Sequence, residues 1–331
     1  MAFIIYLGTM IKLVYRVGLV AAFAALLAAC SGSPLEIKPS ERPLAKSTMM
    51  LLGKKGMDAG SPIFIRIFKQ ESELEVWKAR ADGRFYHFKT YPICNWSGEL
   101  GPKLQQGDKQ APEGFYRVRN SQMNPNSSFH LAFNLGYPNA YDRSHGRTGQ
   151  FLMVHGKCRS AGCYAMTDAL IEEIYALARE SFKGGQDAFH VHAFPFRMTE
   201  ENLRKHRKSR WYGFWRRLKE GYDHFELTRQ PPEVGVCNRQ YLVSVKFLDT
   251  RSVRADAPCP QFVRMPAVPF KPDVRTETAG RTVAPGVKRR MLADSGAPLS
   301  PSVSPTMSLG GLLGGMSPKR SKPPTALGFG D

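Results

Sequence analysis

Residues 151–168 read FLMVHGKCRSAGCYAMTD, a stretch that predicts a strand, a short glycine-containing loop and the start of a helix. The apolar run over residues 151–155 is typical of a buried strand and places His155 at its end. Cys163 follows the loop just ahead of a helical pattern, which Thr167 is placed to cap. We expect this turn to bring an imidazole and a thiol together.

This arrangement is typical of a cysteine nucleophile. The thiolate is the reactive form, and both a helix N-terminus and a nearby imidazole would lower the pKa of Cys163. His155 would take the thiol proton and later return it. Gly162 would let the chain turn sharply and bring a substrate carbonyl to peptide N–H groups, which can stabilise an oxyanion.

Spacing in the sequence leaves two other interpretations of the stretch open. His155 could be a hydrogen-bonded core histidine without a chemical role. A zinc site could also form from His155, Cys158 and Cys163 with His190 or His192. The chain has no compact CxxC-type pattern, so we expect neither a metal site nor a cofactor.

Outward from this stretch, alternating and apolar runs predict a mainly β domain with flanking helices, an α+β class. The expected strands cover residues 63–68, 74–79, 85–91, 129–135, 151–155 and 188–193. The expected helices cover residues 168–182 and 200–222. The second helix would present a basic face, consisting of Arg204, Lys205, Arg207, Lys208, Arg210, Arg216, Arg217 and Lys219. Such a face is usually solvated, although it could bind an anionic polymer or membrane surface.

The amino-terminal end predicts a lipoprotein signal peptide over residues 1–30, with translation starting at Met1 or Met10. Basic residues precede an apolar run over 17–29, which is too short to span a bilayer comfortably. The run ends in Leu-Ala-Ala-Cys, which resembles a bacterial lipobox with Cys30 as the lipidated residue. Because Ser31 rather than Asp follows, we expect a periplasmic protein anchored in the outer membrane. The alternative is an ordinary secretory signal.

The remaining organisation is one domain with appendages. We expect a tether over residues 31–60, a catalytic domain over 61–198, a helical and C-terminal extension over 199–265, and a disordered Pro/Ser/Gly-rich basic tail over 266–331. The 331 residues carry a formal net charge of +19. This charge is diffuse and no nucleic-acid-binding motif accompanies it, so we expect anionic envelope partners rather than nucleic acid.

The stretch around Cys163 resembles the active-site motif of the L,D-transpeptidase (YkuD-like) family, specifically its YafK-like branch. Supporting stretches are Ser97–Lys103, Gly107–Tyr116, Asn134–Arg143 and His145–Gly149, and the resemblance covers roughly residues 61–243. It implies a β-rich catalytic domain with a C-terminal helical extension. It also implies that peptidoglycan stem peptides are the substrates.

The resemblance implies a role for each matching residue. Cys163 would be the nucleophile, His155 the base, and the carbonyl of Gly156 the group that orients the imidazole. Ser160 and Gly162 would shape the loop and the oxyanion site. Stem peptides present carboxylates, which arginines near the motif could bind; the candidates are Arg143, Arg147 and Arg159.

The acceptor of the acyl group is left open. The broader family usually has a second histidine where this chain has Ala161, and the short form is typical of the YafK-like branch. The leading hypothesis is a transpeptidase that crosslinks stems or attaches a lysine-bearing envelope protein. The alternatives are an L,D-specific amidase or peptidase that uses water, and a non-catalytic wall-binding lipoprotein.

We expect an exported protein to meet an oxidising compartment, where its other cysteines can form disulfides. With Cys30 lipidated and Cys163 free, four cysteines allow three pairings. A bond between Cys94 and Cys158 would brace the active-site loop, and one between Cys237 and Cys259 would staple the extension. If Cys158 instead paired with Cys163, the bond would be a redox trap.

Overall fold

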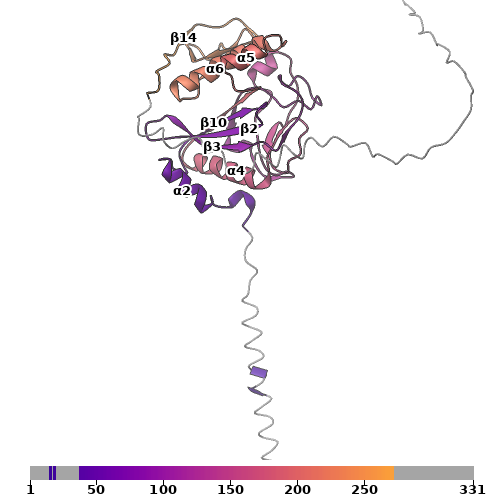
Figure 1. Ribbon diagram of the computed structural model, residues 1–331, viewed down its shortest axis with the longest axis vertical. Helices are drawn as coiled ribbons and strands as arrows, with labels where there is room; N and C mark the ends of the chain where they lie inside the picture. Colours follow the sequence, from indigo (N-terminus) through magenta and orange to yellow (C-terminus); the bar gives the residue numbers. More distant parts are fainter. Residues whose placement is uncertain (1–14, 17, 20–36, 272–331) are drawn as a thin grey trace, which may run out of the picture.

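The structure is a computed structural model that describes residues 15–16, 18–19 and 37–271 (Figure 1). Cys30 and the predicted tail beyond residue 271 lie outside these ranges. Among the described residues, none of the helices has both the length and the apolar character required to cross a membrane. The chain forms two five-stranded sheets with helices packed around them, which confirms the α+β class.

The first sheet has the strand order β3-β2-β1-β10-β5. Its strands are β1 (Ile63–Phe68), β2 (Glu73–Ala79), β3 (Phe85–Pro92), β5 (Gly114–Arg119) and β10 (Ala188–Phe194). Strands β1 and β10 are parallel, and the other neighbours are antiparallel. The central strand β1 is buried along its whole length. Because successive side chains of a strand point to opposite faces, both faces of this sheet must be covered.

The second sheet has the order β4-β9-β8-β7-β6. Its strands are β4 (Asn95–Trp96), β6 (Met123–Ser127), β7 (His130–Asn134), β8 (Met153–His155) and β9 (Tyr164–Ala165). A short helix α3 (Ala140–Ser144) follows β7, and a 3-10 turn η2 (Asn120–Gln122) precedes β6. Strands β8 and β9 are parallel neighbours and pair Val154 with Tyr164.

The main core lies between the two sheets and helix α4 (Asp168–Lys183), which runs under the first sheet in Figure 1. Isoleucines of β1 share it with Val154 of β8, Tyr164 of β9 and Ile174 of α4, all fully buried. The predicted helix start is confirmed, because the Thr167 hydroxyl accepts a hydrogen bond from the Leu170 N–H.

Helices α5 (Glu200–Lys205) and α6 (Tyr212–Thr228) cover the opposite face of the first sheet (Figure 1). The rings of Phe225 and Phe64 lie 4.7 Å apart, and Arg66 of β1 pairs with Glu226 of α6 at 2.7 Å. Two hairpins follow, formed by β11 (Val234–Cys237) with β12 (Gln240–Val243) and β13 (Val245–Phe247) with β14 (Phe262–Arg264). The extension is therefore a layer of the folded body rather than a loose appendage.

The prediction of one helix over residues 200–222 is wrong, because residues 206–211 separate two helices. His206 ends α5 and stacks on Phe196, with ring centroids 4.5 Å apart. The Ser209 hydroxyl accepts the N–H of Trp211, a local side-chain bond that competes with continued helix. The break turns the basic run between the helices into an exposed corner.

The tether predicted over residues 31–60 is wrong for the part that the structure describes. A 3-10 turn η1 (Pro39–Glu41) and helix α2 (Lys46–Lys54) pack against the body. Leu52 is buried, and Arg42 pairs with Glu172 of α4 at 3.0 Å. Lys55 donates to the Phe88 carbonyl at 2.6 Å. The prolines of this segment suggested a linker, but they lead into a helix whose apolar side chains join the core.

Candidate active site

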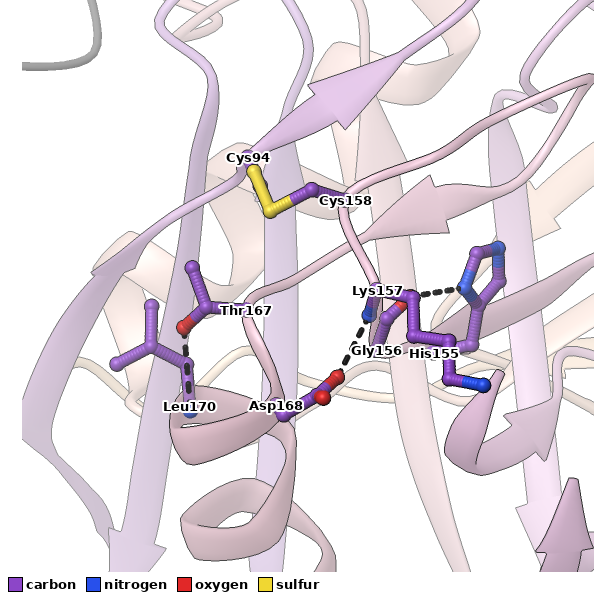
Figure 2. Close-up of a disulfide and its surroundings, with 8 residues drawn as sticks. All are labelled: Cys94, His155, Gly156, Lys157, Cys158, Thr167, Asp168 and Leu170. Atoms are coloured by element: carbon purple, nitrogen blue, oxygen red, sulfur yellow. Dashed lines mark hydrogen bonds between the residues drawn. A yellow bond between two sulfur atoms is a disulfide. The ribbon is translucent and has the colours of Figure 1, made fainter. Parts of the chain in front are cut away.

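His155 lies at the end of β8 and is buried, with 4% of its surface exposed. Its Nδ1 lies 2.7 Å from the carbonyl oxygen of Gly156, as Figure 2 shows. A carbonyl can only accept a hydrogen bond, so Nδ1 must carry the proton and Nε2 keeps a free lone pair. The ring of Phe129 lies against the imidazole, with centroids 4.7 Å apart. This geometry prepares Nε2 to act as a base.

Space rather than backbone conformation requires glycine at position 156. A Cβ there would lie 2.5 Å from a carboxylate oxygen of Asp168 and 3.0 Å from the Phe129 carbonyl. The same Asp168 oxygen accepts the N–H of Lys157 at 2.8 Å (Figure 2). A side chain at position 156 would therefore require a shift that involves the Asp168 carboxylate, the acceptor of the Lys157 N–H.

A disulfide fixes the loop that follows. Cys94 is bonded to Cys158, and Cys237 to Cys259, so one of the three possible pairings is realised. Lys157 and Cys158 adopt left-handed φ angles of 62° and 49°, a conformation that costs non-glycine residues about 1–2 kcal/mol each. The disulfide and the bond to Asp168 hold this turn in place (Figure 2).

Cys163 lies immediately before β9 and is partly buried. Pairing of Val154 with Tyr164 and of His155 with Ala165 sets the register of β8 and β9. Val154 and Tyr164 point into the core, so the alternate residues His155 and Cys163 lie on the outer face of the sheet. The end of β8 and the residue before β9 thus present the imidazole and the thiol on the same face.

The resting thiol contacts backbone groups. The Met153 N–H donates to the Cys163 sulfur at 3.4 Å, and the thiol donates to the Phe151 carbonyl at 3.6 Å. Burial raises the pKa of Cys163, although the Met153 N–H and the charge of Lys103 oppose this effect. Burial also lowers the pKa of His155, and its bond to Gly156 only partly offsets that change. The resting pair is therefore a neutral thiol and a neutral imidazole.

The expectation that a helix N-terminus lowers the pKa of this thiol is wrong. Strand β9 separates Cys163 from helix α4, which begins only at Asp168. The positive end of a helix acts mainly within its first turn. That end instead lies beside the Asp168 carboxylate, which holds the loop after His155.

A chain of hydroxyl groups stabilises the nucleophile turn. The Gly162 N–H donates to the Ser97 hydroxyl at 2.6 Å, and the Ser160 hydroxyl donates to the Cys163 carbonyl at 2.7 Å. The two hydroxyl oxygens are 3.2 Å apart, so Ser97 donates to Ser160. In this state the Gly162 N–H is occupied by Ser97 rather than free for an oxyanion. The local sequence pattern does not reveal this role of Ser97, because 63 residues separate it from Ser160.

A buried ion pair holds the loop that carries Ser97. Lys69, which is fully buried, donates to carbonyls of Glu99, Gly101 and Ala111 and to the Glu113 carboxylate, at 2.7–3.0 Å. Glu113 also accepts the N–H of Gly101 at 2.7 Å and the indole N–H of Trp215 at 2.8 Å. Helix α6 is thereby connected to the loop beside the thiol.

The three candidate arginines have different surroundings. Arg147 is buried and pairs with Asp142 at 2.8 Å, so it is a structural residue rather than a carboxylate ligand. Arg159 is exposed in the loop between His155 and Cys163. Arg143 is also exposed, but it lines a cavity that neither catalytic candidate lines.

The disulfide between Cys94 and Cys158 contradicts two alternatives from the sequence. Cys158 is not available as a zinc thiolate, and it does not pair with Cys163 as a redox trap. Residues 37–271 also contain no group of three or more histidine, cysteine or acidic side chains placed to hold a metal ion.

Comparison with known proteins places this site in a family. A model of the L,D-transpeptidase catalytic domain, YkuD, matches residues 64–184. The Escherichia coli K12 protein named "Putative L,D-transpeptidase YafK" is 47% identical over 185 residues, which is 56% of this chain and 75% of that protein. The chain belongs to the YkuD L,D-transpeptidase family. The E. coli O157:H7 protein of the same name matches equally well.

Solved structures that align with part of this chain include two bacterial proteins. The helical cell shape determining protein Pgp2 from Campylobacter jejuni aligns with a TM-score of 0.33 and 17% identity, over 57% of this chain and 80% of that chain. Bdellovibrio bacteriovorus Bd1075 aligns with a TM-score of 0.29 and 23% identity, over 50% and 61% of the two chains.

Proposed function

We propose that this chain is a peptidoglycan L,D-transpeptidase that works through an acyl-enzyme on Cys163. The observation that supports this most directly is the bond from His155 Nδ1 to the Gly156 carbonyl, which leaves Nε2 free to take a proton. Membership of the YkuD family makes a stem peptide the expected donor. His155 ends β8, and Cys163 directly precedes β9, the parallel neighbour of β8.

The reaction follows from the neutral resting pair. As the carbonyl of the third stem residue approaches, His155 Nε2 takes the thiol proton and the sulfur attacks the carbonyl carbon. The tetrahedral intermediate collapses with loss of the fourth residue as an amine, which receives the proton from His155. A second amine then attacks the thioester and restores the thiol. Peptide N–H groups at the nucleophile turn would stabilise the oxyanion.

The test uses purified protein with tetrapeptide muropeptides and with lysine-linked muropeptides, beside the Cys163→Ala variant. We expect new dimers or transferred stems, and an acyl adduct on Cys163 in the intact mass. Shortened or released stems without dimers would replace transfer by hydrolysis, with water as the acceptor. Absence of any adduct under single-turnover conditions would contradict both enzymatic functions and favour the wall-binding lipoprotein.

We also propose that Cys30 is lipidated, so that the domain acts in the periplasm at the outer membrane. Two disulfides in the folded body are typical of such an oxidising compartment. Metabolic labelling with a fatty acid should mark the wild-type protein and not the Cys30→Ala variant. Label that persists in Cys30→Ala would contradict the anchor without affecting the enzymatic proposal.

A further inference from the structure

A cavity of about 300 Å³ lies where the edge strand β5 meets helix α3 and the β11–β12 hairpin. Neither Cys163 nor His155 lines it, so it is separate from the site described above. The hairpin wall, which includes Val234 and Tyr241, lies outside residues 64–184 that match the family model. The C-terminal extension therefore completes the cavity.

The cavity combines an apolar floor with a charged rim. Phe115, Leu135, Val234 and Val236 supply the floor. Three exposed charged residues, Arg117, Arg143 and Glu233, also line the cavity and define its rim. Binding sites for small ligands are typically concave and largely apolar, with a few polar groups that fix the orientation of the ligand.

The hydrogen-bonding capacity of the rim is largely unused. Within residues 37–271, no hydrogen bond or ion pair engages the guanidinium of Arg117 or the carboxylate of Glu233. Arg143 donates to the carbonyl of Pro138 through one nitrogen only. Elsewhere in this molecule, arginines beside the sheet are paired with carboxylates. The two rim arginines thus differ from the structural ones.

The local charge favours an anionic group. His190 faces Arg117 across the β10–β5 ladder, so both side chains lie on the same face of the sheet. Burial, and then the charge of Arg117, lower the pKa of His190 to about 4. The imidazole is therefore neutral at pH 7, and the guanidiniums determine the positive character of the cavity.

We infer that this cavity binds a carboxylate-bearing segment of a peptidoglycan stem peptide. Planar guanidiniums match a carboxylate through paired hydrogen bonds, and the floor suits the aliphatic part of the peptide. Glu233 suits an amine, which stems also carry. The inference rests on the proposed function and adds a contact remote from the thiol. Binding energy from such a contact can help to position the reacting carbonyl.

The experiment titrates a disaccharide-tetrapeptide muropeptide into Cys163→Ala protein, which binds without turnover, and follows methyl resonances by NMR. Val234 and Val236 report on the cavity, and Met153 reports on the thiol site. We expect the two valines to shift with the ligand. Arg117→Gln or Arg143→Gln should raise the Kd obtained from the valine shifts about tenfold, the usual effect of losing a charged hydrogen bond.

Two controls sharpen the result. Arg119→Gln changes an exposed arginine on the same strand and face that does not line the cavity, and it should leave the response unchanged. The same muropeptide with amidated carboxyl groups should not shift the valines. Valines that do not respond, or that respond equally in all arginine variants, would overturn the inference.

The test of the cavity can fail or succeed independently of the test of the proposed function. An acyl adduct on Cys163 of the wild-type protein tests the chemistry, whereas the valine methyls test the cavity. If the adduct forms but the valine methyl resonances do not shift, only the proposed binding of the stem in the cavity is contradicted. Responsive valines without an adduct would contradict the enzymatic proposal and leave a binding site.

Discussion

Two of the regions in which this molecule buries ionisable groups treat charge in opposite ways. Between the first sheet and helix α6, Arg66 lies 2.8 Å from Glu75, and Lys69 pairs with Glu113. Burial alone would raise the pKa of Glu75, but Arg66 and Arg197 outweigh it and lower that pKa to about 2. Arg66 and Glu75 remain charged because each is the counter-ion of the other.

On the outer face of the second sheet, His155 and Cys163 contact backbone groups instead. Burial acts there without a carboxylate partner for the imidazole and shifts both groups toward their neutral forms. The comparison teaches that a buried ion pair keeps Arg66 and Glu75 charged, whereas His155 and Cys163, which form hydrogen bonds with backbone groups, rest in their neutral forms.

The largest expected effect concerns the region of His155 and Cys163. His155→Gln should lower the rate of Cys163 acylation by about 10³-fold, because it removes a general base. Acylation is measured by intact mass under single-turnover conditions. His206→Gln, at the corner between α5 and α6, is the matched control and should keep the wild-type rate. Equal loss in both variants would contradict the assigned role.

The second effect concerns the buried ion pairs between the first sheet and helix α6. Glu113→Gln leaves Lys69 buried without its counter-ion, and we expect it to lower the free energy of unfolding by about 3–5 kcal/mol. Urea unfolding provides the measurement. Glu220→Gln breaks an exposed pair with Arg217 and should cost less than about 1 kcal/mol. Similar costs at the two positions would contradict the difference drawn between buried and exposed pairs.

A third prediction concerns the hydroxyl chain at the nucleophile turn. Ser97→Ala removes the acceptor of the Gly162 N–H, and we expect acylation to slow by about tenfold. Alkylation of Cys163 by iodoacetamide forms no oxyanion and should keep its wild-type rate. Ser252→Ala, on an exposed turn, serves as the control. If alkylation slows as much as acylation, Ser97 acts on the thiol itself rather than on the turn.

The smallest effect is the pH dependence of the neutral pair. His155 works as a base only when unprotonated, and its pKa lies below the usual value of about 6.5. Acylation should therefore keep more than half of its plateau rate at pH 6.5 and decline only at lower pH. Alkylation of Cys163 should rise with pH up to and beyond pH 9, because its pKa is raised. A plateau of alkylation at pH 6 would indicate a thiolate at rest.

Much of the fold could be predicted from local pattern. Strand β1 has the expected bounds, and Thr167 caps α4 as its position suggested. Strands β9 and β11–β14 are too short for periodicity to show. The local pattern does not predict strand β5, which lies at the edge of the first sheet, because Gly114 and Arg117 interrupt its apolar run.

The site was predictable only where its parts are close in sequence. The spacing of His155 and Cys163 predicted two groups that the register brings onto one face. The predicted lowering of the Cys163 pKa is wrong, because the sequence does not show that a strand lies between the thiol and the helix. Ser97, Lys69 and Glu113 act through tertiary contacts that no local pattern encodes.

The docking of the amino-terminal segment limits how far the domain can travel. Arg179 donates to the carbonyls of Ser40 and Arg42, so the chain is fastened from Ser40 onward. With Cys30 lipidated, as we propose, only the ten residues from Ser31 to Ser40 connect bilayer and body. Fully extended, they reach about 35 Å, against about 100 Å for the expected tether over residues 31–60. The domain would therefore stay within a thin zone next to the lipid, and its substrates would have to reach that zone.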